Sequence, residues 1–160
     1  MPDLIICDTS CLILFDKINK LELLQHCYSC IYVTPEIAEE FGKVLPDWIK
    51  IKVVKNSALQ QTLSQILDKG ESSAIALTFD LPETLIALDD LKARKVAKSL
   101  NLKITGSLGI LVKAKEQGYL EKLLPVLEQV QQTDFRISEN IIKKILVTVG
   151  EWKMSTPNTT

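Results

Sequence analysis

The chain has 160 residues, of which 46% are hydrophobic, and its formal net charge is −1. This length fits one domain with a substantial core, and the composition is typical of a folded protein rather than a disordered one. A charge so close to zero excludes a global basic field, so any polyanion must be bound by a local patch or through metal ions.

Neither a membrane span nor a signal peptide is expected. No apolar run approaches the roughly 20 residues that cross a bilayer. Asp3 and Asp8 interrupt the only stretch that resembles a signal sequence. We therefore expect a cytoplasmic protein without membrane contact, with one domain over residues 1–150 and a polar, disordered tail over 151–160.

The N-terminal run Leu4–Cys7 predicts a buried parallel strand, and Asp8, Thr9 and Ser10 close it. Thr9 and Ser10 are natural N-caps, so a helix is predicted to follow over 11–17. Asp8 would then lie at the carboxyl end of a strand, where open α/β sheets bind ligands. Simple capping of the helix is an equally good interpretation of Asp8 taken alone.

Four cysteines occur in the chain, and Cys27 and Cys30 have the CxxC spacing of zinc sites and redox pairs. A zinc site needs further cysteines or well-spaced histidines, whereas the one histidine, His26, adjoins Cys27. We therefore expect reduced thiols without a metal, and the sequence assigns no role to the pair.

The following segments alternate between strand and helix patterns. Thr34 and Pro35 start a helix that ends near Gly42, with Glu40 beside its apolar face. The alternating stretch 49–53 predicts an edge strand with one wet face. Gly70 breaks a helical run, and Glu71 opens the next helix, where an acid in the first turn is most simply a capping residue. Further helices are predicted over 21–26, 59–67, 93–100, 108–117, 120–132 and 138–149, and further strands over 31–33, 85–88 and 103–105.

This alternation predicts an α/β domain with a mainly parallel sheet. Asp8 and Asp89 each follow a central strand, so their carboxylates meet if the two strands are neighbours. Glu71 and Glu40 can reach the same cleft from adjacent helices. Clustered carboxylates repel one another unless a cation neutralises them, and oxygen ligands favour Mg²⁺ or Mn²⁺. Such a cluster supports attack of metal-activated water on a phosphodiester.

These motifs, taken in order, resemble the PIN domain family of metal-dependent ribonucleases, which includes the VapC-type toxins, and most of all its prokaryotic DUF3368 branch. Each motif is weak alone, but their order and spacing are fairly specific and cover nearly the whole chain. The matching pieces are Asp8-Thr9-Ser10, Thr34-Pro35 with Glu40-Phe41, Gly70-Glu71, Asp89-Asp90 with Ala93-Arg94, Thr105-Gly106-Ser107-Leu108-Gly109 and Phe135-Arg136-Ile137-Ser138.

The resemblance implies a three-layer α/β/α PIN-like fold with C-terminal helices and an acidic pocket for one or two Mg²⁺ or Mn²⁺ ions. Asp8 would be the central ligand, completed by Glu40, Glu71 and Asp89, which together would also be the catalytic residues. Ser10 would hold Asp8 or a water in position. Thr105 and Ser107, with Asp90, would support the site. The stretch Thr105–Ser107 offers only hydroxyls where many relatives place a further acid or hydroxyl, which leaves the binding of a second metal open.

Several alternatives remain open at this point. Asp90 competes with Asp89 for the ligand position, and Glu36 and Glu39 compete with Glu40. Arg94, Lys95 and Lys98 are expected on the outer face of the helix over 93–100. They are candidates for phosphate contacts, although such a stripe is more often solvated surface.

The implied partners are an RNA substrate, an antitoxin protein and a second copy of the chain in a homodimer, although packing on the chain's own core explains the apolar C-terminal helices equally well. The leading hypothesis is a ribonuclease, which would be the toxin of a toxin–antitoxin pair. The alternative is a non-catalytic PIN-like module that binds nucleic acid or protein.

Overall fold

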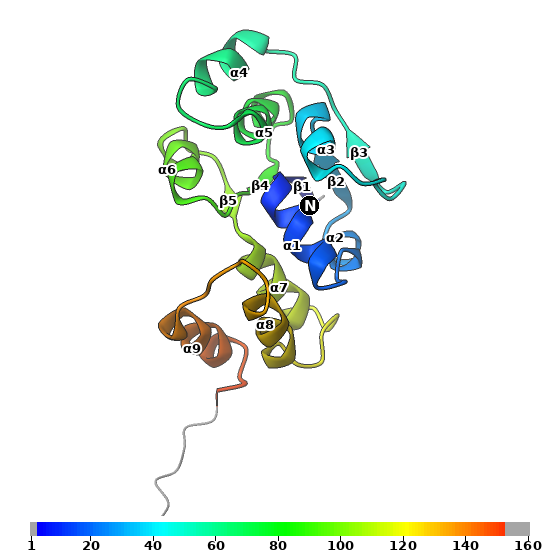
Figure 1. Cartoon of the computed structure of the whole chain (residues 1–160), viewed down its shortest axis with the longest axis vertical. Coiled ribbons are helices and arrows are strands. Elements are labelled where there is room, and N and C mark those ends of the chain that lie inside the picture. Colours follow the sequence, from blue (N-terminus) through cyan, green and yellow to red (C-terminus); the bar gives the residue numbers. More distant parts are fainter. Residues whose placement is uncertain (1–2, 153–160) are drawn as a thin grey trace, which may run out of the picture.

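The computed structural model describes residues 3–152, which contain one five-stranded sheet with the order β3-β2-β1-β4-β5 (Figure 1). Every pair of neighbouring strands is parallel, and Ile6 of the central strand lies between Tyr32 and Ile86. The predicted three-layer α/β/α fold is confirmed. The strands are β1 (Leu4–Cys7), β2 (Cys30–Val33), β3 (Ile49–Ile51), β4 (Leu85–Ala87) and β5 (Ile104–Thr105).

Helices connect the strands and continue after the last one. α5 packs against β1 and β4, while α7 packs against α1 and α2. In Figure 1, α8 and α9 lie beyond α7, on the side away from α4 and α5. The helices are α1 (Thr9–Lys17), α2 (Glu22–Cys27), α3 (Pro35–Phe41), α4 (Ser57–Leu63), α5 (Lys69–Asp80), α6 (Leu91–Ser99), α7 (Ser107–Glu116), α8 (Leu124–Gln131) and α9 (Glu139–Thr148).

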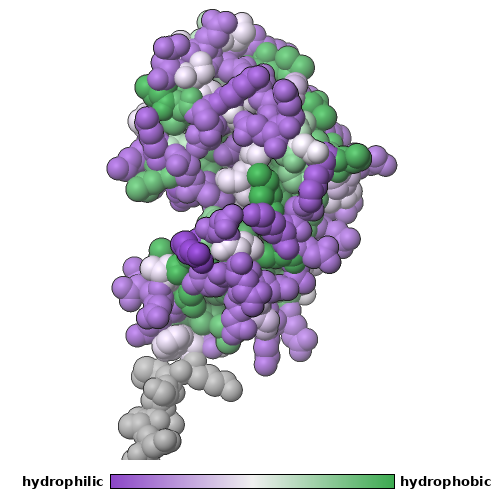
Figure 2. Space-filling view, viewed as in Figure 1, coloured by the Kyte–Doolittle hydropathy of each residue, from purple (hydrophilic) through white to green (hydrophobic). Residues whose placement is uncertain are grey.

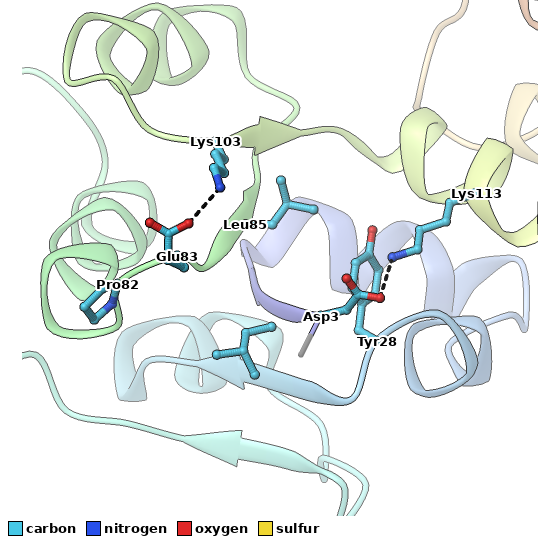
Figure 3. A pocket seen from close by; sticks show the side chains of 8 residues that line it. Asp3, Tyr28, Pro82, Glu83, Leu85, Lys103 and Lys113 are labelled. Atoms are coloured by element: carbon cyan, nitrogen blue, oxygen red, sulfur yellow. Dashed lines mark hydrogen bonds and ion pairs between the residues drawn. The ribbon is translucent and has the colours of Figure 1, made fainter. Parts of the chain in front are cut away.

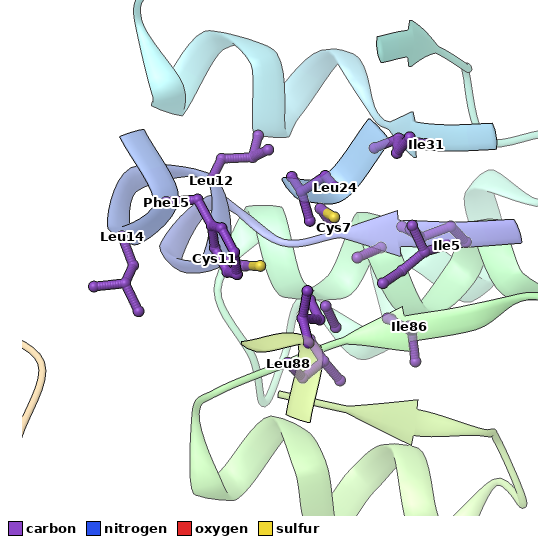
Figure 4. Close-up of a cluster of buried hydrophobic side chains, with 14 of the residues drawn as sticks. Ile5, Cys7, Cys11, Leu12, Leu14, Phe15, Leu24, Ile31, Ile86 and Leu88 are labelled. Carbon is purple, nitrogen blue, oxygen red and sulfur yellow. The ribbon is translucent and has the colours of Figure 1, made fainter. Parts of the chain in front are cut away.

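The core forms around β1, because this strand has a neighbour on each side and helices over each face. Ile5 and Ile6 are fully buried although they point to opposite faces of the sheet. Figure 4 shows Leu12 and Phe15 of α1 and Leu24 of α2 within the same buried cluster as Ile5. β1 is therefore fixed from all sides, and Asp8 follows it without a break.

The start of α3 follows its sequence closely. Thr34 Oγ1 accepts a hydrogen bond from the amide of Ile37 at 3.2 Å, Pro35 occupies the first turn, and Gly42 ends the helix with a φ of 70°. The predicted cap, start and end of this helix are confirmed.

The prediction for the edge strand is right about its position and wrong about its pattern. β3 is the edge of the sheet, but Ile51 and Val53 are 54% and 74% exposed, so the alternation does not mark a buried face. Ile49 is buried, but Ile51 is the last residue of β3 and Val53 lies beyond the strand, so only the start of the alternation lies against the core.

The break between α4 and α5 lies earlier than predicted. α4 ends at Leu63, Asp68 caps α5, and Gly70 lies inside the first turn of α5 rather than between two helices. Close to the C-terminus, α8 begins at Leu124 rather than at residue 120.

Within residues 3–152, no helix combines the length and the apolar character needed to cross a bilayer. The predicted tail lies outside the described residues from residue 153 onward. Glu151 falls inside them: its carboxylate accepts hydrogen bonds from the amides of Leu123 and Leu124 at 2.7 and 3.1 Å. This contact ties the end of the α9 segment to the start of α8.

Candidate active site

Asp8 lies at the carboxyl end of β1, in the N-cap position of α1. Its amide donates to the carbonyl of Ala87 at 3.2 Å, which fixes it beside the end of β4. Only 5% of the residue is exposed. Its side chain forms no capping hydrogen bond with α1, so capping does not account for this buried carboxylate.

Asp89 reaches the same edge from the end of β4. Ser107 donates to it twice, from its amide to Oδ1 at 2.8 Å and from Oγ to Oδ2 at 2.5 Å. A Cβ on Gly106 would lie 2.9 Å from Asp89 Oδ1, so the close approach of this carboxylate depends on the glycine. The segment Thr105–Ser107 was predicted to support the site, and Ser107 contacts an acid directly. Thr105 lies at the end of β5, where its hydroxyl donates to the Gly106 carbonyl at 3.4 Å.

Glu40 approaches from α3 and lies against the first turn of α5. A Cβ on Gly70 would lie 2.5 Å from Glu40 Oε1 and 3.2 Å from Thr9 Oγ1. The glycine thus makes room for the carboxylate. Thr9 Oγ1 is buried and has no hydrogen-bond partner within residues 3–152, so a polar group next to Glu40 is left unsatisfied.

Glu71 forms a capping box with Asp68 at the start of α5. Asp68 Oδ1 accepts from the Glu71 amide at 2.8 Å, and Glu71 Oε1 accepts from the Asp68 amide at 3.3 Å. The capping interpretation of Glu71 is therefore confirmed. Glu71 is also buried, with only 7% of the residue exposed. Asp68 adds a fifth carboxylate, which was not predicted from the sequence. Its signal was the pattern of Asp68 with Glu71 three residues later.

The pKa values of two acids report that these carboxylates are neighbours. Burial raises the pKa of Asp8 to about 7, a hydrogen bond from the Thr9 backbone opposes this rise, and the charges of Asp68, Glu40 and Asp89 add to it. The pKa of Glu71 is raised to about 8. Burial is the largest cause, the neighbouring Asp68 side chain raises the pKa further, and the charge of Asp8 also contributes. Charges from four elements thus act on one edge of the sheet.

Several predicted or competing residues lie apart from this group. Ser10 is exposed and lines a groove with Leu14 and Phe135. Asp90 is exposed and caps α6 by accepting from the Ala93 amide at 2.9 Å. Glu36 accepts from the side chain of Gln60 at 3.1 Å, and Glu39 is exposed. The geometry therefore favours Asp89 over Asp90.

The basic residues of α6 divide into two kinds. Lys95 and Lys98 are exposed, as a solvated stripe would be. Arg94 is half-buried, and its Nη1 donates to the carbonyl of Leu88 at 2.8 Å, so its place on the outer face was wrongly predicted. A Cβ on Gly106 would lie 3.0 Å from Arg94 Nη1. The guanidinium therefore lies at the turn that also carries Asp89.

The donor set suits a hard divalent cation in its chemistry, since it offers only carboxylate oxygens with a buried hydroxyl beside them. The acids do not surround one common metal position, however. Within residues 3–152, no group of three or more His, Cys, Asp or Glu side chains is arranged to hold a metal ion. Asp89 is held by Ser107 and Glu71 by the Asp68 backbone, at separate points of the edge.

A pocket of about 430 Å³ lies at the opposite edge, where β1 and β4 begin. Figure 3 shows that its charged side chains point toward one another. Lys103 pairs with Glu83 at 2.8 Å, and Lys113 pairs with Asp3 at 3.3 Å. Each of the two carboxylates that line this pocket is paired with a lysine, so the lining offers no cluster of unpaired carboxylates for a cation.

The chain thus has an all-parallel sheet with carboxylates from four elements along its carboxyl edge, as expected for a PIN-like fold. The sequence model of the PIN domain family DUF3368 matches residues 4–151, and the chain belongs to this family. No significant match occurs among curated proteins or among solved structures. PIN domains are generally nucleases that bind nucleic acid and typically use divalent metals.

Proposed function

We propose that this chain is a metal-dependent endoribonuclease in which Asp8, Glu40, Glu71 and Asp89 hold Mg²⁺ or Mn²⁺. The observation that supports it most is the convergence of carboxylates from four elements on the carboxyl edge of β1 and β4. Family membership supports the nuclease class. The RNA substrate is what the resemblance to metal-dependent ribonucleases implies, and the choice of metal is inferred from the oxygen ligands that the acids offer.

A bound divalent ion would polarise the phosphodiester and lower the pKa of an attacking water. The chain's own contribution is to hold the carboxylates in place. Ser107 orients Asp89 through two hydrogen bonds, and the capping box orients Glu71. Asp8 gives up its proton when a cation binds, because the positive charge offsets the burial and repulsion that raise its pKa.

A bound cation would have to draw the carboxylates into one ligand set, because within residues 3–152 no three of them are arranged as one. Carboxylates that repel one another separate when no cation is present and converge when one neutralises them. Glu40 is exposed and extends from the last turn of α3, so this side chain can move at little cost.

The test is Mn²⁺ binding by calorimetry, with Asp8→Asn as the variant and Asp90→Asn as the matched control. Asparagine at position 90 keeps the α6 cap, and Asp90 lies outside the proposed ligand set. We expect the wild type and Asp90→Asn to bind Mn²⁺ and Asp8→Asn to lose binding. Cleavage of RNA by the variants that bind Mn²⁺, and not by Asp8→Asn, then completes the test.

A second candidate function is a non-catalytic PIN-like module that binds nucleic acid or protein. The absence of a finished metal cage among the described acids favours it. This alternative predicts that neither the wild type nor Asp8→Asn binds Mn²⁺ at millimolar concentration. The calorimetry therefore separates the two functions before any RNA is chosen.

We also propose that residues 1–150 act as one domain, because a single hydrophobic cluster extends from Ile5 to Leu146 of α9. The cytoplasm is the proposed location of the protein. As the toxin of a toxin–antitoxin pair, the protein would also bind an antitoxin or a second copy of itself. Ile141 and Val147 leave apolar surface on α9 for such a partner, at 45% and 56% exposure.

A further inference from the structure

A groove of about 490 Å³ begins at Asp89 and runs between α6 and the connection from α8 to α9. Figure 2 shows the molecule hollowed between the part that carries α6 and the part that carries α9. Arg94 lines one wall, while Phe135, Arg136 and Ile137 form the other. The groove thus starts at a proposed metal ligand and leads away from it.

Phe135 also lines a second groove of about 370 Å³, which contains Ser10 and Leu14 of α1. One aromatic side chain therefore lines both the groove along α1 and the groove that starts at Asp89. Phe135 is half-buried, so part of its ring remains open to a ligand.

The connection that carries Phe135 is fixed by hydrogen bonds. The side chain of Gln131 donates to the carbonyl of Ile137 at 2.8 Å and accepts from its amide at 3.2 Å. The amide of Phe135 donates to Thr133 Oγ1 at 3.1 Å. Because the segment is anchored on both sides of Arg136, the ring and the guanidinium are presented at little cost in conformational entropy.

The charges that line the larger groove favour an anionic ligand. Arg94 and Arg136 are its two cations, and Asp89 is its one acid, with both oxygens accepting from Ser107. Arginine offers five N–H donors, so the single bond from Arg94 to Leu88 leaves others for a phosphate. A basic peptide would find no free carboxylate in this lining.

We propose that this groove binds a nucleotide of single-stranded RNA next to the acids, with its base against Phe135 and its phosphate between Arg94 and Arg136. An aromatic ring beside guanidinium groups is the usual platform for unpaired nucleotides, and stacking of this kind tolerates every base. The proposal rests on the proposed function for its RNA substrate, but it concerns binding and needs no metal.

The test measures binding of a fluorescein-labelled oligoadenylate RNA to the full chain in EDTA, where no metal-dependent cleavage occurs. Phe135→Leu keeps an apolar side chain and removes the ring, and we expect it to weaken binding about fivefold or more. Phe79→Leu is the matched control, since Phe79 is 50% exposed at the far end of α5. Phe135→Tyr keeps the ring and should therefore bind RNA with wild-type affinity. If Phe135 served only as an apolar side chain in packing, Phe135→Leu would bind as well as Phe135→Tyr.

Arg136→Gln provides an independent variant that will fold, because Arg136 is exposed. It should lower the slope of log affinity against log salt by about 0.7, whereas Phe135→Leu should leave that slope unchanged. A fluorescent adenine analogue in the RNA should be quenched by the wild type and not by Phe135→Leu.

Wild-type RNA affinity in both Phe135→Leu and Arg136→Gln would overturn the proposal, because it would show that RNA does not contact this groove. This outcome is independent of Mn²⁺ binding by the acids. If the acids bind Mn²⁺ but the groove variants keep their RNA affinity, the proposed function stands and the groove proposal fails. If the groove variants lose RNA affinity but Mn²⁺ does not bind, the groove proposal stands and the proposed function fails.

Discussion

Asp8 and Glu71 are two buried carboxyl groups whose pKa values, about 7 and about 8, keep a large share of each group protonated at neutral pH. Burial is the largest cause for both, and neighbouring acids add to it. Acids buried in this way lower the free energy of unfolding above pH about 4, because the unfolded chain can ionise them and the folded chain cannot do so as easily. A divalent cation returns that stability by binding the ionised form.

The sign of this effect predicts how stability depends on pH. The folded chain retains protons on Asp8 and Glu71 that the unfolded chain releases, so the unfolding free energy falls as pH rises from about 4 to about 8. Asp8 contributes at most about 4 kcal/mol of this fall. Urea denaturation in EDTA at several pH values measures it.

Asp8→Asn should reduce this slope between pH about 4 and about 7, while Glu71 still contributes up to about 8. An identical slope in wild type and Asp8→Asn would contradict the assignment. Saturating Mn²⁺ should flatten the slope in the wild type alone, since only there does a cation replace the protons.

At the scale of elements, the first turn of α5 determines where Glu71 and Glu40 lie. Thr34 Oγ1 and Ser73 Oγ are 2.6 Å apart, and Ser73 Oγ donates to the carbonyl of Gly70 at 2.7 Å. These buried hydroxyls join the start of α3 to the start of α5. The connection holds Gly70 against Glu40 and Glu71 near Asp8.

Gly70→Ala should separate stability from metal binding. Alanine inside a helix is favoured over glycine by about 0.5–1 kcal/mol. The new Cβ would displace Glu40 Oε1, the mobile end of a side chain, and would also lie 3.2 Å from the buried Thr9 Oγ1, which offsets this gain. We expect little change in thermal stability together with Mn²⁺ affinity weakened about 10-fold. Differential scanning calorimetry and Mn²⁺ titration measure the two effects.

The control is the same change in a Glu40→Gln background. If Gly70 acts through Glu40, adding Gly70→Ala to Glu40→Gln should cause no further loss of Mn²⁺ affinity. Equal losses in both backgrounds would show that Gly70 acts on some other ligand.

The elements that local patterns define were predictable from the sequence, and those that depend on packing were not. The cap at Thr34 and the strand ending at Cys7 follow from local residue chemistry. The exposure of Ile51 does not, because it depends on where β3 leaves the sheet. The register of β1 against β4 brings Asp8 to the end of β4, and no pattern within either strand specifies that pairing.

The same distinction applies to the candidate site. Asp8 and Asp89 could be proposed because both follow strands. Ser107 was implied only by the resemblance to the PIN domain family. The contact between Gly70 and Glu40 joins α5 to α3 and is visible only in three dimensions. Arg94 was misplaced because its helical position suggested the outer face, whereas its long side chain reaches back to Leu88.

For the whole molecule, carboxylates and arginines occupy adjoining parts of one edge. The acids lie at the ends of β1 and β4, and Arg94 and Arg136 lie along the groove that starts at Asp89. A chain with a net charge of −1 cannot attract RNA over its whole surface. Binding must instead depend on the few cations of this edge and on bound metal.

This distribution predicts a weak dependence of RNA binding on salt. Contacts from Arg94 and Arg136, joined by Lys95 and Lys98 of α6, would release about three counterions from a single strand, since each phosphate contact contributes about 0.7 to the slope. We expect a slope of log affinity against log salt of about −3 in EDTA, measured by fluorescence anisotropy of a labelled oligoadenylate. The double change Lys95→Gln with Lys98→Gln should lower it to about −1.5. A slope twice as steep in the wild type would indicate a basic surface elsewhere. An unchanged slope in the double variant would remove Lys95 and Lys98 from the interface and leave Arg94 and Arg136 as the cations that bind the RNA.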